Sequence, residues 1–274
     1  TSEDYAFYPL RVVTSGAQAS FTANTRFSFC SIYWPFVASV GPDKQIILIT
    51  NGVDQMYYWD MTYTIDYGFV ATGSIPQLTA FRCGSTSVKL EGFLATAWKG
   101  RAWGWKGNTE YFASADNPTL WDDDDTTAGF FEAPMEQYQN PIRGNYIVSN
   151  NLILINRDTI GHVYATGSSI EPFTYSEDHE GSGTFNHRTV LPWKDNLIFF
   201  DRRPPYLFRW NGTTLFSLDP QQNMVAGIQQ YLDIGDIPNI RMAIGYDTLF
   251  ISMGIVGGTT RMLARVNLTR TDAN

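Results

Sequence analysis

Residues 189–218 read TVLPW-KDN-LIFFD-RRPP-YLFRW-NG-TTLFSL, which is a series of apolar runs separated by short polar breaks. Short runs rich in β-branched and aromatic residues, bounded by Gly, Asn, Asp and Pro, are typical of β-strands. The stretch therefore predicts a four-stranded antiparallel meander. Its last break predicts a type I′ turn at Asn211 and Gly212, because both central residues of that turn must be left-handed.

The rest of the chain repeats this pattern around a short apolar run that follows a tight polar turn. The central runs are QIILIT (45–50), RAWGW (101–105), LILIN (152–156), LIFFD (197–201) and LFISM (249–253). Their starts are separated by 56, 51, 45 and 52 residues. Four-stranded units that recur roughly every fifty residues are typical of β-propeller blades, which bury their apolar faces against neighbouring blades.

The repeat predicts a single all-β domain over residues 1–274, a β-propeller of about five blades, or six if a partial blade is counted. A β-sandwich with irregular loops is the alternative. Residues 1–32 would close the ring or form the partial blade. Segment 219–239 interrupts the pattern, and its MVAGIQQYL stretch is interpreted as a short helix or an inter-blade loop. The predicted blades span roughly residues 33–70, 91–122, 144–176, 188–218 and 240–268.

Composition excludes several classes of protein. A net charge of −8 and a pI near 4.8 argue against a general phosphate-binding surface. The two cysteines, Cys30 and Cys83, rule out a disulfide framework but leave a single bridge possible. No apolar run is long enough to span a membrane, and the N-terminal residues lack the pattern of a signal peptide. We therefore expect no membrane partner.

The stretch ASADNPTLWDDDD (113–125) nearly matches the Asp-box of sialidase-type propellers. Ser114, Asp116 and Trp121 stand at the offsets of that motif, whereas Pro118 replaces its glycine. An Asp-box marks a turn on the outer edge of a blade and carries no catalytic group. We interpret the stretch as a structural turn that Ser114 or Asp116 caps, that Pro118 stiffens, and that Trp121 anchors between blades.

The four aspartates at 122–125 contain weak calcium candidates, Asp122 and Asp124. Calcium binds six to eight oxygen ligands, and the EF-hand spacing that supplies them is missing here. Four adjacent like charges are typical of a solvated loop. We therefore expect no bound metal.

No catalytic motif stands out in the sequence. Glycoside hydrolysis needs converging carboxylates, but spacing singles out no pair among the candidates Asp54, Asp60, Asp158, Glu177, Asp195 and Asp247. The histidines are His162, His179 and His187, and SEDHEG (176–181) gathers one of them with three acids, which favours an exposed loop over a metal site. The sequence predicts no enzyme, no catalytic residue and no cofactor.

A single short basic element offers a possible contact surface. Arg202 and Arg203 begin the RRPP break, and Arg209 and Trp210 follow on the next run. Basic residues interleaved with aromatic ones are a feature of nucleic-acid-binding surfaces. Arg202 and Arg203 are candidate contacts to a DNA channel or to a partner protein, whereas such a pair more often only solvates a hairpin tip.

Three stretches resemble β-propeller virion proteins of tailed bacteriophages, of the tail nozzle, hub or packaged-DNA-stabilisation type. NGVDQMYYWD (51–60) resembles their NG-D…W hairpin, and GRAWGWKGNTEYFASADNPTLWD (100–122) resembles their strand, hairpin and D-P-x-x-W turn. Residues 181–220, from GSGTFNHR to FSLDP, resemble a later blade with a Gly-rich approach and a Y-x-F-x-W-N-G hairpin. The resemblance covers roughly residues 40–220.

The resemblance implies a structural component of a phage tail or neck, found in the virion and assembled in the host cytoplasm. Such a protein would form an oligomeric ring around or beside the DNA channel and help to retain or deliver the genome. Its partners would be other copies of itself, neighbouring tail or neck proteins, and DNA that passes non-specifically past an acidic lumen. The alternatives are a carbohydrate-binding or glycoside-cleaving propeller that acts as a receptor-binding module, and a generic interaction scaffold.

Overall fold

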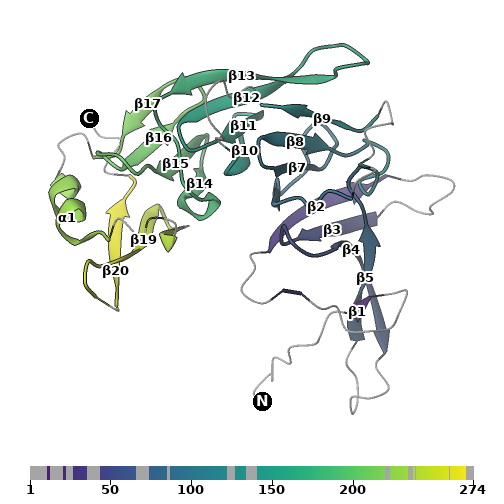
Figure 1. Cartoon of the computed structure of the whole chain (residues 1–274), viewed down its shortest axis with the longest axis horizontal. Coiled ribbons are helices and arrows are strands. Elements are labelled where there is room, and N and C mark those ends of the chain that lie inside the picture. Colours follow the sequence, from purple (N-terminus) through teal and green to yellow (C-terminus); the bar gives the residue numbers. More distant parts are fainter. Residues whose placement is uncertain are drawn as a thin grey trace. The chain divides into compact units, whose positions relative to one another are not determined.

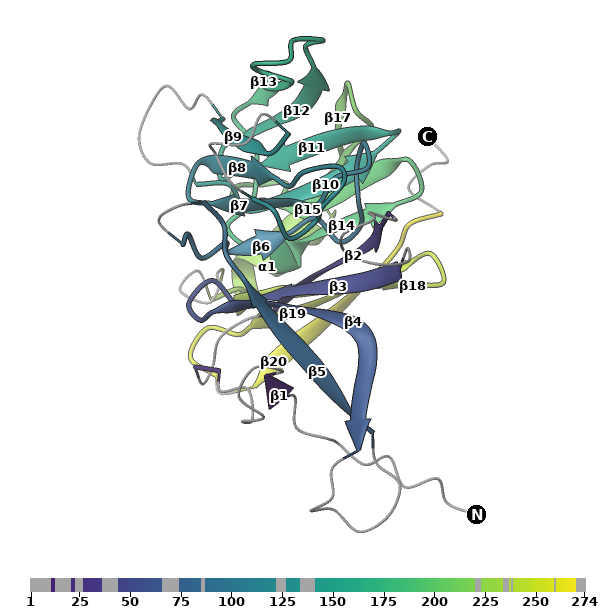
Figure 2. The same cartoon turned by 90° about the vertical axis from the view of Figure 1, so that its right-hand side faces the viewer.

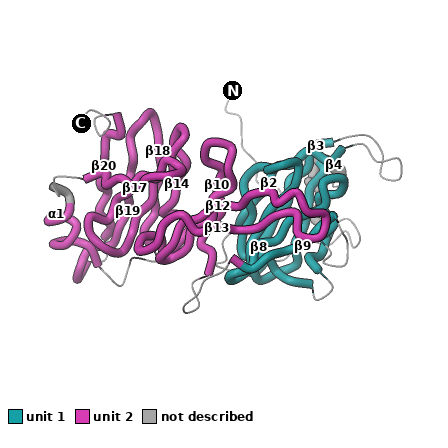
Figure 3. Tube along the Cα trace, turned by 90° about the horizontal axis from the view of Figure 1, so that it is seen from above, with its two compact units in different colours: residues 1–132 teal, residues 133–274 magenta. Residues whose placement is uncertain are grey.

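The computed structural model describes residues 11–12, 21–22, 27–35, 44–65, 74–84, 87–121, 127–133, 141–219, 223–233, 237, 239–258 and 260–269. Apart from one α-helix and short 3-10 segments, the regular structure in these ranges is β-strand (Figure 1). The chain divides into two compact units, residues 1–132 and residues 133–274 (Figure 3). The all-β prediction is confirmed, and five successive antiparallel sheets match the predicted number of blades.

The first unit contains two sheets. In the first sheet, four strands form an antiparallel meander and a short fifth strand pairs in parallel with the outermost one. Figure 2 shows β4 and β5 running on together beyond the other strands of this sheet. The strands are β1 (Arg11–Val12), β2 (Ser28–Trp34), β3 (Lys44–Thr50), β4 (Met56–Ile65) and β5 (Ser74–Phe81) in the first sheet, and β6 (Gly92–Phe93), β7 (Trp103–Lys106), β8 (Thr109–Phe112) and β9 (Gly129–Glu132) in the second.

The two sheets of the first unit adjoin through their first meander strands. The Ser31 N–H of β2 donates to the Ala95 carbonyl at 2.9 Å, and Ser31 forms a parallel bridge with Thr96 just after β6. Cys30 and Cys83 are buried free thiols in the core of this unit, so they do not form the bridge that the sequence left possible.

The second unit contains three sheets, each a meander in chain order. The last sheet has three strands in the described part of the chain. The elements are β10 (Gly144–Val148), β11 (Asn151–Ile155), β12 (Thr159–Ala165) and β13 (Phe173–Glu180); η1 (His187–Thr189), β14 (Val190–Trp193), β15 (Asn196–Phe200), β16 (Leu207–Trp210) and β17 (Leu215–Ser217); then α1 (Asn223–Tyr231), β18 (Arg241–Gly245), β19 (Thr248–Gly254) and β20 (Arg261–Asn267).

First strands of neighbouring sheets run in the same direction in the second unit, as the inner strands of propeller blades do. Ahead of β14, the Asn186 side chain donates to the Ile240 carbonyl just ahead of β18 at 3.2 Å. At the far end of β14, the Trp193 indole donates to Asp247, just beyond β18, at 2.8 Å. Two hydrogen bonds at opposite ends fix the relative direction of the two strands and hold the sheets together.

Tight turns recur between the first and second strands of the sheets. Two consecutive left-handed residues make this turn at Lys99–Gly100, Ser149–Asn150 and Tyr246–Asp247. The type I′ turn predicted at Asn211–Gly212 is wrong, because Gly212 has a positive φ and Asn211 does not. Instead the Asn211 side chain accepts the Thr214 N–H at 2.8 Å, a local side-chain bond that replaces the two-residue turn.

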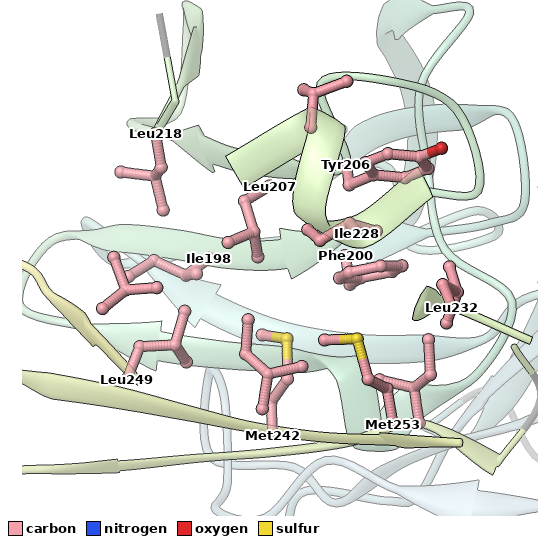
Figure 4. Packing of buried hydrophobic residues seen from close by; sticks show 14 of the residues in the cluster. Ile198, Phe200, Tyr206, Leu207, Leu218, Ile228, Leu232, Met242, Leu249 and Met253 are labelled. Atoms are coloured by element: carbon pink, nitrogen blue, oxygen red, sulfur yellow. The ribbon is translucent and has the colours of Figure 1, made fainter. Parts of the chain in front are cut away.

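The MVAGIQQYL stretch forms the helix α1, as one of its two predicted alternatives stated. Ile228 and Leu232 pack from this segment onto a core that also contains Phe200 of β15 and Met253 of β19 (Figure 4). The Asp219 carboxylate accepts the Val225 N–H at 3.2 Å near the start of the helix, where N–H groups lack intrahelical partners. The helix therefore covers an apolar face that the three-stranded last sheet shares with its neighbour.

Candidate functional site

Two equivalent hairpins of the second unit each present an arginine directly after a buried polar residue. In β11–β12 the sequence is Asn156-Arg157-Asp158, and in β15–β16 it is Asp201-Arg202-Arg203. Asn156 and Asp201 are fully buried, whereas the arginines are partly exposed. The repeat thus places charged side chains at the same edge of two neighbouring sheets.

The link between β13 and β14, residues 181–186, lies against both hairpins. The Thr184 N–H donates to the Asn156 carbonyl at 2.6 Å, and the Gly183 N–H donates to the Asp201 carboxylate at 3.1 Å. A Cβ atom on Gly183 would lie 2.3 Å from the Asn156 carbonyl oxygen. Glycine is needed here because the backbones approach more closely than any side chain permits.

Asp158 is shared by three guanidinium groups. Its carboxylate oxygens lie 3.7 Å from Arg157 Nε, 3.5 Å from an Arg202 Nη and 3.3 Å from an Arg203 Nη. Charge-assisted hydrogen bonds of this kind normally measure about 2.7–2.9 Å. No single arginine therefore holds Asp158 in a tight bidentate pair, and one carboxylate sits among three cations.

The buried carboxylate of Asp201 binds backbone N–H groups of the second hairpin and of the link. Its carboxylate accepts the Arg203 N–H at 2.9 Å in addition to the Gly183 N–H, and Arg203 Nε lies 3.5 Å away. Arg203 also donates to the Gly181 carbonyl. The bend that follows contains a cis peptide bond between Pro204 and Pro205. Backbone donors thus satisfy much of this buried carboxylate.

An aromatic ring supports two of the arginines. The guanidinium groups of Arg157 and Arg202 lie 4.9 Å and 5.4 Å from the centroid of the Phe185 ring, within the range of cation–π attraction. Phe185 itself packs against the buried core of the unit. The side chains of Arg157, Arg202 and Arg203 remain 33–44% exposed. These arginines, Asp158, Asp201 and Phe185 are called the arginine cluster below.

The arginine cluster can bind an anion through permanent charge. Guanidinium groups stay protonated at any physiological pH and present planar forks of donors that suit phosphate or carboxylate oxygens. Two acidic groups are present for three basic ones, and Asp201 is turned inward. The exposed part of the cluster is therefore cationic.

Sequence reasoning found Arg202 and Arg203 but missed Arg157 and Phe185. It placed Asp158 among candidate glycosidase carboxylates, whereas the structure pairs it with arginines. A signal for Arg157 was present in the repeat, because aligning LILINRD with LIFFDRR puts Arg157 opposite Arg202. Phe185 had no such signal, because it precedes the repeating strand pattern of its blade.

Asn117 caps the predicted turn at 113–121, in place of the predicted Ser114 or Asp116. Asn117 Oδ1 accepts the Thr119 N–H at 3.1 Å, whereas Asp116 is exposed and the Ser114 hydroxyl accepts from Thr127 at 2.9 Å. Pro118 is buried, and its carbonyl accepts the Trp121 indole N–H at 2.8 Å.

Trp121 lies in the core of the first unit. Its ring centroid is 6.4 Å from that of Phe81 in β5 and 5.7 Å from that of Phe93 in β6, so it contacts both sheets. Asp122 and Asp124, the weak calcium candidates, lie outside the described residues.

Three of the remaining carboxylate candidates, Asp54, Asp60 and Asp247, make separate local contacts. Asp54 accepts from the Asn51 side chain and from the Thr22 N–H, both at 2.6 Å, and these hydrogen bonds lower the pKa of Asp54. Asp60 forms an ion pair with Lys44 at 2.9 Å, and Asp247 accepts from the Trp193 indole. These contacts hold turns and strand ends in place.

Histidines of the second unit are also dispersed. His162 Nδ1 lies 2.8 Å from the Asp178 carboxylate across β12 and β13, and the His179 ring lies 6.0 Å from that of Trp210. His187 belongs to η1. Among the residues that the structure describes, no group of three or more His, Cys, Asp or Glu side chains is placed to hold a metal ion.

Within the described ranges, no helix has both the length and the apolar character that crossing a bilayer requires. A scan against known protein families finds none that matches the chain, and a search of curated proteins finds no match.

Proposed function

We propose that this protein is a non-enzymatic structural component of a tailed-phage virion, placed in the tail or neck, where it forms an oligomeric ring around or beside the DNA channel. The observation that carries the proposal is the arginine cluster. Its side chains keep a fixed charge and rest on a core-anchored ring, which suits a contact surface. The placement in a phage tail or neck rests on the resemblance of residues 40–220 to phage propeller proteins.

Rigid sheets support a mechanical role. Neighbouring sheets of the second unit are joined at both ends of β14, through Asn186 and through Trp193. Largely apolar strands such as β15, with Leu197, Ile198 and Phe199 completely buried, fill the space between them. A stack of sheets joined in this way resists bending and presents its hairpins as fixed surfaces to neighbouring subunits.

Charge is distributed in a way that suits passage of DNA. Residues 1–132 carry eight basic and fourteen acidic side chains, whereas residues 133–274 carry eleven and thirteen. The acidic surplus therefore belongs mainly to the first unit. Lining a shared channel, it would keep DNA from adhering, while the arginine cluster provides a local contact.

The test is the oligomeric state of the purified full chain, measured by size-exclusion chromatography with light scattering and by negative-stain electron microscopy. We expect a closed ring of defined copy number. A protein that stays monomeric at every concentration would overturn the ring. A glycan-array screen and glycosidase assays run beside it, and specific binding or cleavage of a glycan would replace the proposal with a carbohydrate-directed function.

A further inference from the structure

Arginines gather at one edge of the three sheets of the second unit. Besides the three of the arginine cluster, four others stand at the start of a strand or just ahead of it on this edge. The seven, called the arginine-rich edge, are Arg143, Arg157, Arg188, Arg202, Arg203, Arg241 and Arg261.

Strand pairing and hydrogen bonds place these residues at the same edge. The Arg143 N–H donates to the Ile155 carbonyl, which directly precedes the hairpin of Arg157. Arg241 begins β18 and pairs with Ser252, and the Arg261 side chain donates to the same serine at 2.9 Å. Because β14 and β18 run in parallel, the N-terminal ends of the sheets' first strands share one side of the unit.

Among the residues that the structure describes, acidic side chains at this edge are fewer and partly turned inward. They are Asp158, Glu180, Asp201, Asp219 and Asp233. Asp201 and Asp219 are buried and accept backbone N–H groups. The charge that the edge presents to solvent is therefore mainly that of its arginines.

We propose that the arginine cluster binds the phosphodiester backbone of duplex DNA, with Asp158 as an internal competitor for the guanidinium groups. This inference deepens the proposed function by naming the chemical group that the ring would contact. A phosphodiester offers two anionic oxygens, as Asp158 does, and could accept from the same forks at normal hydrogen-bond length. Cations repeated along one edge suit a polymer whose charges also repeat.

Removing the carboxylate of Asp158 should change DNA affinity in opposite directions, depending on whether Asp158 competes with DNA or only holds the hairpin in place. If the carboxylate of Asp158 only held the hairpin in place, its removal would weaken DNA binding. A competing carboxylate would do the opposite, because its loss frees donors of Arg202 and Arg203. We therefore expect Asp158→Asn to tighten binding of DNA.

The experiment measures fluorescence anisotropy of a labelled random-sequence duplex with the full chain over a range of salt concentrations. Compared with the native protein, the double variant Arg202→Ala with Arg203→Ala is expected to bind about tenfold more weakly or worse. The plot of log K against log salt should also become less steep, with the magnitude of its negative slope reduced by roughly two, since each phosphate contact contributes about 0.9. Asp158→Asn should bind several-fold more tightly, on the order of one extra contact.

Controls separate the cluster from net charge and from folding. Arg265→Ala removes one exposed arginine from β20, away from the cluster, and should leave the salt slope nearly unchanged. Thermal unfolding and circular dichroism show whether each variant folds. Arg202→Lys with Arg203→Lys keeps the charge and should recover most of the slope but less of the affinity, because lysine lacks the fork.

Several results would overturn the inference. These are no binding of duplex DNA at low salt, equal binding by the double alanine variant, or weaker binding by Asp158→Asn. Equal competition by poly-glutamate would point to an acidic protein segment instead of DNA. Ring formation is scored separately in every variant: a ring that ignores DNA defeats the inference alone, and a monomer that binds DNA through the cluster defeats only the proposed function.

Discussion

The indole Nε1–H of Trp193 donates to the Asp247 carboxylate at 2.8 Å and joins the ends of β14 and β18. The ring of Trp193 is buried, so water does not readily replace this partner. Asp247 is also the second residue of a tight turn, with φ at 58°, and its carbonyl accepts the Leu268 N–H. One residue thus terminates a hairpin and fastens two neighbouring sheets.

Two replacements of Asp247 should show how much these two roles together contribute to stability. Asp247→Ala is expected to lower the free energy of unfolding by about 2–3 kcal/mol, because it removes a charge-assisted acceptor and puts a poorly tolerated residue in the left-handed region. Asp247→Asn should cost less than about 1 kcal/mol, since asparagine keeps an acceptor and tolerates that conformation. Urea unfolding followed by tryptophan fluorescence measures both. Equal losses for the two variants would contradict this account.

Local chemistry explains which turns could be predicted from the sequence. The tight polar turns predicted ahead of the central runs are confirmed at Lys99–Gly100 and Tyr246–Asp247, where two consecutive residues are left-handed. Asn211–Gly212 looked more typical of such a turn. There the asparagine side chain bonds the following N–H groups and so favours a different local conformation, which the residue pair alone does not reveal.

The arginine cluster was only partly predictable, because its members come from three separate segments. Arg202 and Arg203 were visible as a basic pair, and Asp158 as a carboxylate in a hairpin. These residues come together because the link between β13 and β14 packs against both hairpins. Gly183 lets the backbone of the link approach the Asn156 carbonyl, and two guanidinium groups lie over the ring of Phe185. Contacts between sheets leave no periodic trace in one sequence, whereas strands within a sheet do.

Two glycines offer a matched test of this packing. Gly183→Ala is expected to destabilise the protein by at least about 2 kcal/mol, because the new methyl group would meet the backbone carbonyl of Asn156. Gly227→Ala, in the middle of α1 with no atom within 4 Å of the new Cβ, should instead stabilise by about 0.5–1 kcal/mol. Thermal unfolding measures both shifts. A neutral Gly183→Ala would show that the link is not held as tightly as the distances indicate.

Burial should protect the thiols of the first unit from modification. Burial raises the pKa of the Cys30 thiol to about 12, and neither cysteine exposes surface. Because the thiolate is the reactive form, we expect almost no reaction of the native protein with a disulfide reagent at about pH 8. Two thiols per chain should react after unfolding in guanidinium. Rapid reaction of one thiol without denaturant would contradict the buried position of that cysteine.

Tyr146 should make the stability of the second unit sensitive to alkaline pH. Its hydroxyl donates to the His187 carbonyl at 3.0 Å, and burial raises the pKa of the phenol well above its ordinary value of about 10. Below about pH 10, the ordinary pKa of a phenol, Tyr146 is neutral in both the folded and the unfolded state, and the free energy of unfolding does not vary with its titration. Above it the unfolded chain releases the proton while the folded chain keeps it, so the free energy of unfolding falls as pH rises.

Urea unfolding at pH values between about 8 and 11 measures this decline. Tyr146→Phe should cost about 1 kcal/mol near neutral pH through the lost hydrogen bond, but it should flatten the alkaline decline. The decline will not vanish, because burial also raises the pKa of Tyr175 to about 12. Tyr246→Phe is the control, since that side chain is fully exposed and should leave the pH dependence as it is. If Tyr146→Phe and the native protein lose stability in parallel above pH 10, the phenol of Tyr146 ionises without cost in the fold, and its hydroxyl is not buried against His187 in solution.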